Sequence, residues 1–307
     1  MKHLNQDTKS ILLASDFSQT SQRAFDAAVR LARALDAKLH ILHVNEEDAI
    51  FEGHDSKEIA HFLENIAGSR SEWMKRYEAN AREAGVAAEA ILRDGKPAEG
   101  ILLEAERVDA GVIVIGTQGL HGLGNMLPGS VARKVLRSSK RPVMVVSRMA
   151  GVAPSSNEGS FDNIVYPTDF SDESRAGLKV CELVGKKSKA KVTLVHILRM
   201  PRVLPALPGE PLIAIPNKAV GHLMGRLEAQ MVDFRSDLGE ERISSEVGVH
   251  SDPAEGIAEM SAHAGVDLIV MPRHSSHGMG AYFFGSTTER VARIAPVPVL
   301  VFSPLSG

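Results

Sequence analysis

The chain has 307 residues, of which 44% are hydrophobic and 24% charged, and its formal net charge is −3. This length predicts two domains of ordinary size, and the composition is that of a globular protein. The small negative charge argues against nucleic acid as a partner, and no apolar run approaches the roughly 20 residues that span a bilayer. The first residues also lack the apolar centre of a signal peptide. We therefore expect a cytoplasmic protein that binds neither nucleic acid nor membrane.

Apolar runs alternate with stretches of helical periodicity along the first half of the chain. Strands are expected at residues 11–14, 39–44, 88–92, 112–115 and 143–146, and helices at residues 24–35, 59–77, 98–106 and from 130 onward. Strands that alternate with helices favour a parallel sheet covered on both faces.

The second half repeats this pattern in the same order. The run Asp16-Phe17-Ser18 recurs as Asp169-Phe170-Ser171, an offset of 153 residues (169 − 16), and Gly129-Ser130 recurs as Gly285-Ser286, an offset of 156 (285 − 129). Ordered self-similarity of this kind indicates a duplication. We predict a first domain at residues 1–150, a linker at 151–160 and a second domain at 161–307.

A glycine-spaced loop is the strongest functional signal in the first half. Gly116 and Gly119 directly follow the predicted strand 112–115, and Gly129 and Ser130 open the next predicted helix. Glycines let the backbone approach a phosphate, and unpaired N–H groups at a helix start attract an anion. Asp16, at the end of the first strand, should lie on the same edge of the sheet and can accept a hydrogen bond from a nucleoside. A tight turn and a helix cap are the alternative interpretations of the loop and of Asp16.

Other kinds of site fit the sequence less well. The spacing of Gly124 and Gly129 lacks the lysine of a hydrolytic P-loop, and Gly122-Leu123-Gly124 lacks the third glycine of a dinucleotide site. Residues 116–130 contain no Asp or Glu to hold magnesium or activate water, so we expect binding without fast turnover. Four histidines recur at equivalent positions, without the companions of a metal site, and are expected to pack or hydrogen-bond: His43, His121, His196 and His277. Cys181 is expected in the core.

The glycine spacing, with Asp16 and the strand order, resembles the universal stress protein family, whose ATP-binding members carry Gly, two residues, Gly, nine residues, Gly, then Ser or Thr. The resemblance covers nearly the whole chain as two tandem domains. It implies Rossmann-like folds of the adenine nucleotide alpha hydrolase type, each a five-stranded parallel sheet flanked by helices. It also implies a role in stress survival and pairing of the two domains through residues 143–146 and 299–302, as an internal pseudo-dimer that can associate further as a homodimer.

By this resemblance the first domain binds ATP or ADP, with or without Mg²⁺. The expected contact residues are Ser15, Asp16, Val44, Gly116, Thr117, Gly119, Gly129, Ser130 and Val131. In the second domain Pro272 and Ser275 replace the first two glycines, and proline both removes an N–H and fixes φ. We predict that only the first domain binds nucleotide in the usual way, although Arg273 and His274 offer cations in place of the lost amides.

Two further functions stay open on sequence grounds. Residues Pro201 to Pro216 combine five prolines with apolar side chains, which suits either a loop packed onto the second domain or a surface for an apolar ligand or protein partner, as in a scaffold or carrier. A slow ATPase is the third hypothesis, and it needs an acid from outside the glycine loop, for which Asp94 is the candidate.

Overall fold

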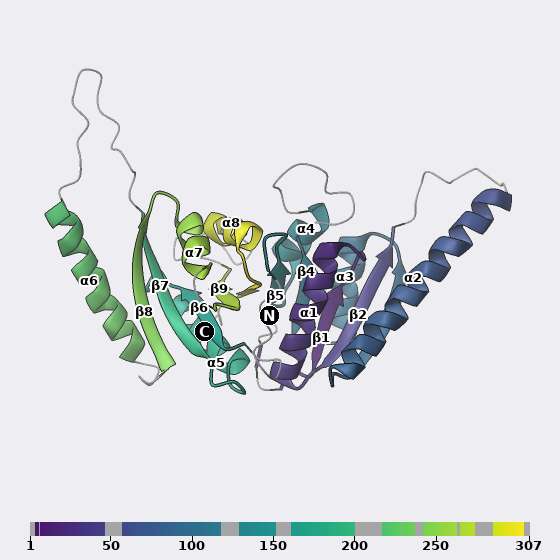
Figure 1. Cartoon of the computed structure of the whole chain (residues 1–307), viewed down its shortest axis with the longest axis horizontal. Coiled ribbons are helices and arrows are strands. Elements are labelled where there is room, and N and C mark those ends of the chain that lie inside the picture. Colours follow the sequence, from purple (N-terminus) through teal and green to yellow (C-terminus); the bar gives the residue numbers. More distant parts are fainter. Residues whose placement is uncertain are drawn as a thin grey trace, which may run out of the picture. The chain divides into compact units, whose positions relative to one another are not determined.

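The computed structural model covers all 307 residues. It describes residues 4–5, 7–46, 57–117, 129–151, 161–199, 217–236, 242–262, 265–273 and 285–303 (Figure 1). The chain divides into two compact units, of which unit 1 consists mainly of Met1–Arg148 and unit 2 mainly of Phe161–Gly307, together with Met149–Ser156. The predicted linker lies almost wholly outside the described residues, as does the segment from Pro201 to Pro216. Among the described residues no helix is long and apolar enough to cross a membrane.

Unit 1 alternates strands and helices throughout. Its elements are β1 (Ser10–Ala14), α1 (Gln19–Leu35), β2 (Lys38–Asn45), α2 (Lys57–Glu83), β3 (Ala88–Asp94), α3 (Pro97–Arg107), β4 (Val112–Gly116), α4 (Ser130–Ser138) and β5 (Val143–Val146). The strands pair in parallel in the order β3-β2-β1-β4-β5. All residues of β1 and β5 are buried, which is why these strands read as continuous apolar runs.

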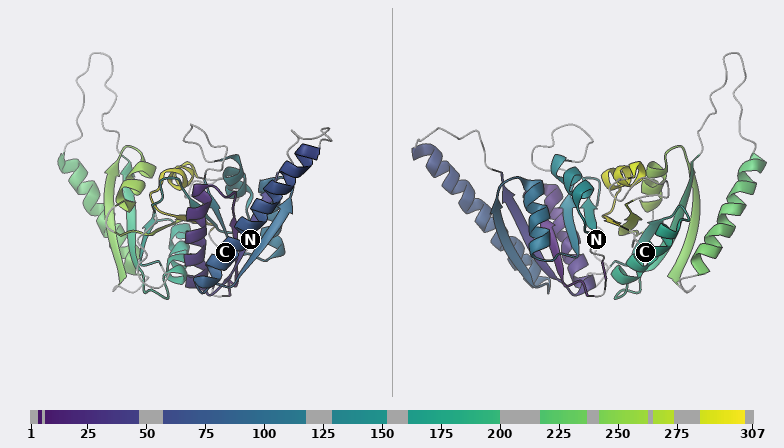
Figure 2. Two further views of the ribbon diagram at one scale, coloured as in Figure 1. Left: turned by 45° about the vertical axis from the view of Figure 1, so that its right-hand side comes forward. Right: turned by 180° about the vertical axis from the view of Figure 1, so that it is seen from behind.

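Helices cover both faces of this sheet (Figure 2). Because the crossovers are right-handed, α1 and α2 lie on one face of the sheet and α3 and α4 on the other. On the first face α1 contacts β1, β2, β4 and β5, and α2 contacts β2 and β3. Lys134 of α4 joins Glu99 of α3 through an ion pair of 2.9 Å. The sequence-based prediction of a helix-flanked parallel sheet is therefore confirmed.

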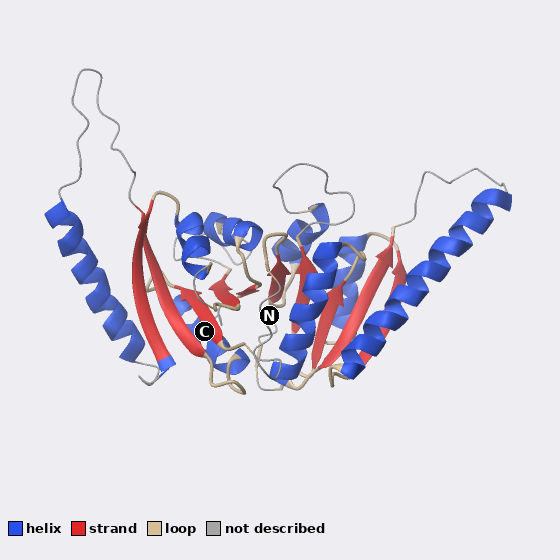
Figure 3. Ribbon diagram, viewed as in Figure 1, coloured by secondary structure: helices blue, strands red, loops and turns tan. Residues whose placement is uncertain are grey.

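Unit 2 repeats the arrangement with β6 (Asn163–Pro167), α5 (Asp172–Val184), β7 (Lys191–Arg199), α6 (Asn217–Ser236), β8 (Ile243–His250), α7 (Pro253–Ser261), β9 (Leu268–Pro272), α8 (Ser286–Ile294) and β10 (Val299–Phe302). Its strand order is β8-β7-β6-β9-β10, again parallel (Figure 3). Arg290 of α8, equivalent to Lys134, pairs with Asp252 at 2.7 Å and also with Glu255 of α7. Cys181 is buried in α5, as expected, and burial raises the pKa of its thiol.

The cores of the two units differ in the sizes of the side chains that pack between the sheet and the first helix, α1 in unit 1 and α5 in unit 2. Gly177 of α5 lies so close to Tyr166 and Phe302 that an added Cβ would overlap both rings. The equivalent residues of unit 1 are Ala24, Leu13 and Val146, all buried. A larger helix residue thus faces smaller strand residues in unit 1, and the reverse holds in unit 2.

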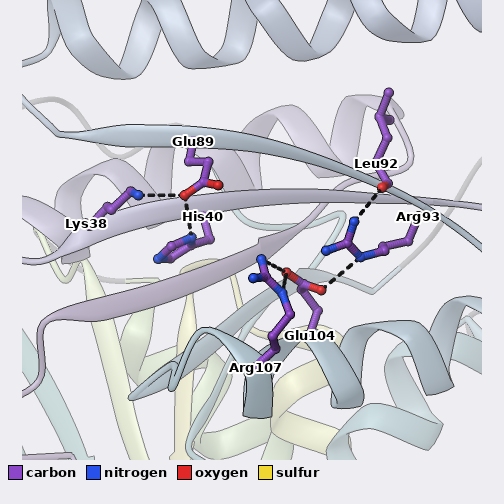
Figure 4. A network of polar contacts seen from close by, with 7 residues as sticks. All are labelled: Lys38, His40, Glu89, Leu92, Arg93, Glu104 and Arg107. Carbon is purple, nitrogen blue, oxygen red and sulfur yellow. Dashed lines mark hydrogen bonds and ion pairs between the residues drawn. The ribbon is translucent and has the colours of Figure 1, made fainter.

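A polar network on β2, β3 and α3 distinguishes unit 1 (Figure 4). Glu104 is 3% exposed, and its carboxylate accepts hydrogen bonds from Arg93 at 3.1 Å and from Arg107 at 2.7 Å. Burial would raise the pKa of Glu104, but the hydrogen bond and charge of Arg107, together with Arg93, outweigh it and lower the pKa. Beside it, Lys38 pairs with Glu89 at 2.6 Å. Because unit 2 has Met260 and Val249 at the positions of Glu104 and Arg93, the fold does not require this network.

Candidate functional site

The candidate site of unit 1 lies where the strand order reverses. β1 and β4 are neighbours with Ala14 opposite Ile115, while the chain leaves β1 toward β2 and leaves β4 toward β5. In open α/β sheets such a switch point opens at the carboxyl ends of the strands, and it is the usual place for a ligand. Ser15 and Asp16 follow β1 there, beside Gly116, which ends β4, and Thr117, which follows it.

The two ends of the glycine loop meet at this edge. The Thr117 N–H donates to Val146 O at 2.9 Å, and the Gly129 N–H donates to Thr117 O at 2.5 Å. Gly116 and Gly129, which are 13 positions apart in the sequence (129 − 116), are thereby brought to one place. The loop between them, residues 118–128 with Gly119, lies outside the described residues.

Gly129 is the N-cap of α4, and no side chain of the described residues caps this helix. The first turn contains no acidic residue, Ser130 is exposed and Val131 is half-buried. A helix start has unpaired N–H groups and a partial positive charge, both of which favour an anion. The start of α4 therefore fits a phosphate group.

Gly116 has a packing role that the sequence interpretation missed. A Cβ added here would come within 3.0 Å of Thr20 Cγ2 and 3.3 Å of the Thr20 backbone carbon. The glycine therefore lets the end of β4 approach α1 closely, whatever it does for a ligand. Thr20 is itself 5% exposed.

Asp16 holds the loop between β1 and α1 together. Its Oδ1 accepts a hydrogen bond from the Ser18 N–H at 3.1 Å and another from the Ser21 hydroxyl, while the Ser21 Oγ accepts from the Asp16 N–H at 3.1 Å. Ser18 in turn caps α1 by accepting from the Ser21 N–H at 3.2 Å. The turn interpretation of Asp16 is thus confirmed, the cap of α1 is Ser18 rather than Asp16, and contact of Asp16 with a nucleoside stays a prediction.

Aromatic residues pack against this loop, and sequence reasoning did not connect them with the site. Phe17 has a φ of 64°, and its ring lies 4.4 Å from His43, 6.4 Å from Trp73 and 6.3 Å from Tyr77 between centroids. A positive φ is unusual for a bulky residue and is held here by the surrounding hydrogen bonds. One signal in the sequence could have pointed to these residues, because Phe17 and His43 recur in the second half as Phe170 and His196.

His43 is neutral and structural. Its Nδ1 lies 2.8 Å from Ser15 O, so Nδ1 carries the proton, and its ring is buried. His196 makes the equivalent contact to Thr168 O at 2.8 Å. The prediction that these two recurring histidines hydrogen-bond is confirmed, whereas His121 and His277 lie outside the described residues.

Acidification should destabilise unit 1 through His43. Burial lowers the pKa of His43 below its ordinary value of 6.5, so the unfolded chain takes up a proton at a pH where the folded chain does not. The free energy of unfolding should fall as the pH drops through about 6.5. Urea unfolding at pH 7.5 and 5.5 measures this, and His43→Gln should reduce the pH dependence. An identical pH dependence in the variant would contradict the assignment.

Val44 lies beyond the last bond between β1 and β2. The β1–β2 register ends at Ala14 opposite Leu42, where the Ser15 N–H donates to Leu42 O at 2.9 Å. The prediction that β2 ends at Val44 is wrong by one residue, because Asn45 still pairs with Asp94 of β3. Val44 is 8% exposed and packs against α3, where an added Cβ on Gly100 would come within 3.0 Å of its side chain.

Asp94, the acid of the slow-ATPase hypothesis, is the last residue of β3, which extends two residues beyond the predicted strand 88–92. Its carboxylate accepts a hydrogen bond from the Asn45 amide at 2.8 Å, and the residue is exposed. Across the described part of the chain, no group of three His, Cys, Asp or Glu residues is placed to hold a metal ion.

Unit 2 keeps the first loop and changes the second. Asp169 Oδ1 accepts from the Ser171 N–H at 3.1 Å and from the Ser174 hydroxyl at 2.7 Å, and Phe170 has a φ of 63°. At the glycine loop, Pro272 ends β9, Arg273 follows it, and Gly285 begins α8. The Asp-Phe-Ser loop is therefore common to both units, whereas Pro272 and Arg273 replace Gly116 and Thr117 at the glycine loop.

A model of the universal stress protein family matches residues 7–147 and 160–303. The chain belongs to the universal stress protein family. The two matched segments confirm the tandem arrangement inferred from the sequence.

The relatives described below each match a stretch of this universal stress protein that is about one domain long. The universal stress protein YxiE of Bacillus subtilis is 38% identical over 143 residues, which are 44% of this chain and 97% of that protein. A universal stress protein from the QAH/OAS sulfhydrylase 3′ region of Thermus aquaticus is 36% identical over 140 residues, 45% of this chain and 98% of that protein. The crystal structure of a universal stress protein from Archaeoglobus fulgidus shares the fold over 97% of this chain and 99% of its own, with a TM-score of 0.65 at 20% identity.

Proposed function

We propose that this universal stress protein binds ATP or ADP in unit 1 and acts in the cytoplasm as a nucleotide-dependent regulatory protein of stress survival. The observation that carries the proposal is the contact of the Gly129 N–H with Thr117 O, which brings the two ends of the glycine motif to the start of α4. Family membership supports it, because ATP-binding members carry this glycine spacing.

The phosphate groups are assigned to the start of α4. Gly129 presents no side chain to the ligand, Gly116 contributes its backbone at the same edge, the first N–H groups of α4 donate to phosphate oxygens, and the exposed Ser130 hydroxyl adds a donor. Thr117, Val131 and Gly119 complete this end of the proposed site. The nucleoside is assigned to the neighbouring edge, beside Ser15, Asp16 and Val44.

The residues at this edge of the sheet are better suited to regulation through nucleotide binding than to fast hydrolysis of the nucleotide. Neither residues 116–130 nor the first turn of α4 supplies an acid to activate water. Bound nucleotide would instead stabilise the conformation that it fits, by an amount set by its concentration relative to its dissociation constant. The pairing of the two domains through their last strands, and any homodimer, stay predictions of the family resemblance.

Nucleotide that co-purifies with the full chain should be an adenine nucleotide at one equivalent per chain. The measurement is release by denaturation, identification by mass spectrometry and quantification against protein concentration. Two equivalents would refute the restriction of nucleotide to unit 1. No nucleotide, together with no binding of added ATP or ADP, would refute the proposed function and leave the scaffold or carrier hypothesis.

A further inference from the structure

Arg273 in unit 2 is buried, and no described residue forms an ion pair with its charge. The residue is 2% exposed, and it is among the largest side chains that are fully buried. Among the described residues its Nε has no hydrogen-bond partner, and no ion pair involves its guanidinium. Burial lowers the pKa of Arg273, and no neighbouring charge adds to that effect. A buried arginine is ordinarily paired, so this one needs an explanation.

The backbone of Arg273 touches the start of α8. Its N–H donates to Phe302 O at 2.7 Å, which continues the β9–β10 ladder by one residue, and its carbonyl accepts from the Gly285 N–H at 3.0 Å. Gly285 is the N-cap of α8, and no side chain of the described residues caps this helix either. The first turn of α8 differs from that of α4 in carrying one acidic residue, Glu289. Thr288, in the first turn, donates to Pro272 O at 3.2 Å. The start of α8 is therefore fixed against residues 272 and 273.

The ladder also decides which face of the sheet Arg273 occupies. Phe302 and Pro272 are paired in register, so their side chains share a face, and an added Cβ on Gly177 of α5 would overlap Phe302. Both residues therefore face α5. Successive residues of a strand point to opposite faces, which puts the Arg273 side chain on the face that α7 and α8 cover.

Unit 1 shows that the shared fold does not need an arginine here. The equivalent residue is Thr117 (273 − 156), which is 3% exposed and makes the same two backbone contacts, to Val146 O and from the Gly129 N–H. The change to arginine accompanies the loss of the glycines, since Pro272 replaces Gly116 and has no N–H to donate. At the same helix start, unit 2 therefore has the rigid Pro272 and the positively charged Arg273 where unit 1 has Gly116 and Thr117.

We propose that Arg273 and the start of α8 form a second anion site, which takes the phosphate group of a small phosphorylated molecule. The guanidinium offers a planar set of donors that matches a phosphate, and the first N–H groups of α8 add donors and a partial positive charge. A bound phosphate also neutralises the buried charge. This site uses residues of unit 2 alone and goes beyond the nucleotide site proposed for unit 1.

The test compares the full chain with Arg273→Thr, which introduces the residue that unit 1 has at this position. The probe is inorganic pyrophosphate, against sodium chloride of the same ionic strength. In chloride the variant should have the higher melting temperature, because it lacks the unpaired buried charge. Binding of pyrophosphate at the unit 2 site should raise the melting temperature of the parent but not of Arg273→Thr. A Gly129→Val background weakens the site of unit 1, and calorimetry in this background should show that Arg273→Thr lowers the affinity for pyrophosphate by about tenfold or more.

Arg293→Gln is the matched control, since it removes a charge from the opposite end of α8, where Nε is also buried without a partner among the described residues. It should leave pyrophosphate binding unchanged. Should Gly129→Val fail to fold, the number of pyrophosphate ions bound by the otherwise native chain gives the result instead, and Arg273→Thr should lower it by one. The same stoichiometry and affinity in both chains, or no binding to either, would overturn the second site. Failure of ATP to bind would affect only the proposal for unit 1.

Discussion

Gly129→Val is expected to lower the affinity of unit 1 for ATP by about tenfold or more, a loss of at least about 1.4 kcal/mol. Gly129 is the N-cap of α4 and has ordinary extended backbone angles, with φ −52° and ψ 149°, so the backbone tolerates a side chain. A branched side chain would occupy the space in front of the first N–H groups of the helix. Isothermal titration calorimetry with ATP measures the loss.

Gly68→Val is the control for this experiment. Gly68 lies in α2 of the same unit, and a Cβ added there meets nothing within 4 Å. The control should keep native affinity. Circular dichroism checks that Gly129→Val is folded, and unchanged ATP affinity in the folded variant would show that the phosphate groups do not bind at the start of α4.

Gly177→Ala is expected to destabilise unit 2 by about 2 kcal/mol, although alanine is the better helix former. The added methyl group would overlap the rings of Tyr166 and Phe302. Tyr166 cannot move aside cheaply, because it is fully buried and its hydroxyl donates to Ser174 O at 2.7 Å. Hydrogen exchange of unit 2 peptides, read by mass spectrometry, measures the change in that unit. Gly225→Ala is the control, because Gly225 of α6 has open space around it and should gain stability.

Unit 1 supplies the compensating residues for a stringent version of this test. The triple variant Gly177→Ala, Tyr166→Leu, Phe302→Val carries the set found at Ala24, Leu13 and Val146. It should be more stable than the sum of the single changes predicts, by about 1 kcal/mol or more. Strictly additive effects would mean that the three positions do not pack as one group.

The fold could be predicted because each half of the sequence carries several independent signals of it. Buried strands such as β1 and β5 are uninterrupted apolar runs, and the internal repeat fixes two copies of one strand order. The exact strand ends could not be predicted, because Asn45 and Asp94 are polar. They stay in the sheet through pairing with each other, including an amide-to-carboxylate hydrogen bond of 2.8 Å.

The candidate site was only partly accessible to sequence reasoning. Spacing identified Gly116, Gly129 and Asp16 as ligand contacts, with a tight turn and a helix cap as the alternatives, but it did not identify the residues that these positions contact. Thr20, which accounts for Gly116 through packing, and Ser21, which accepts and donates at Asp16, belong to α1 and carry no motif of their own. Arg273 was noticed as a cation, but its burial depends on which face the strand presents, and that is a property of the register with β10.

The exchanged sizes of the Ala24 and Gly177 groups have a consequence for how this duplicated chain folds. Two tandem copies of one fold are prone to misassembly, in which a helix of one copy docks on the sheet of the other. The methyl group of Ala24 would collide with Tyr166 and Phe302 if α1 docked on the strands of unit 2, and Gly177 would leave a void if α5 docked above Leu13 and Val146. Each helix therefore fits its own sheet better than its neighbour's, and this difference in fit disfavours the misassembled pairing.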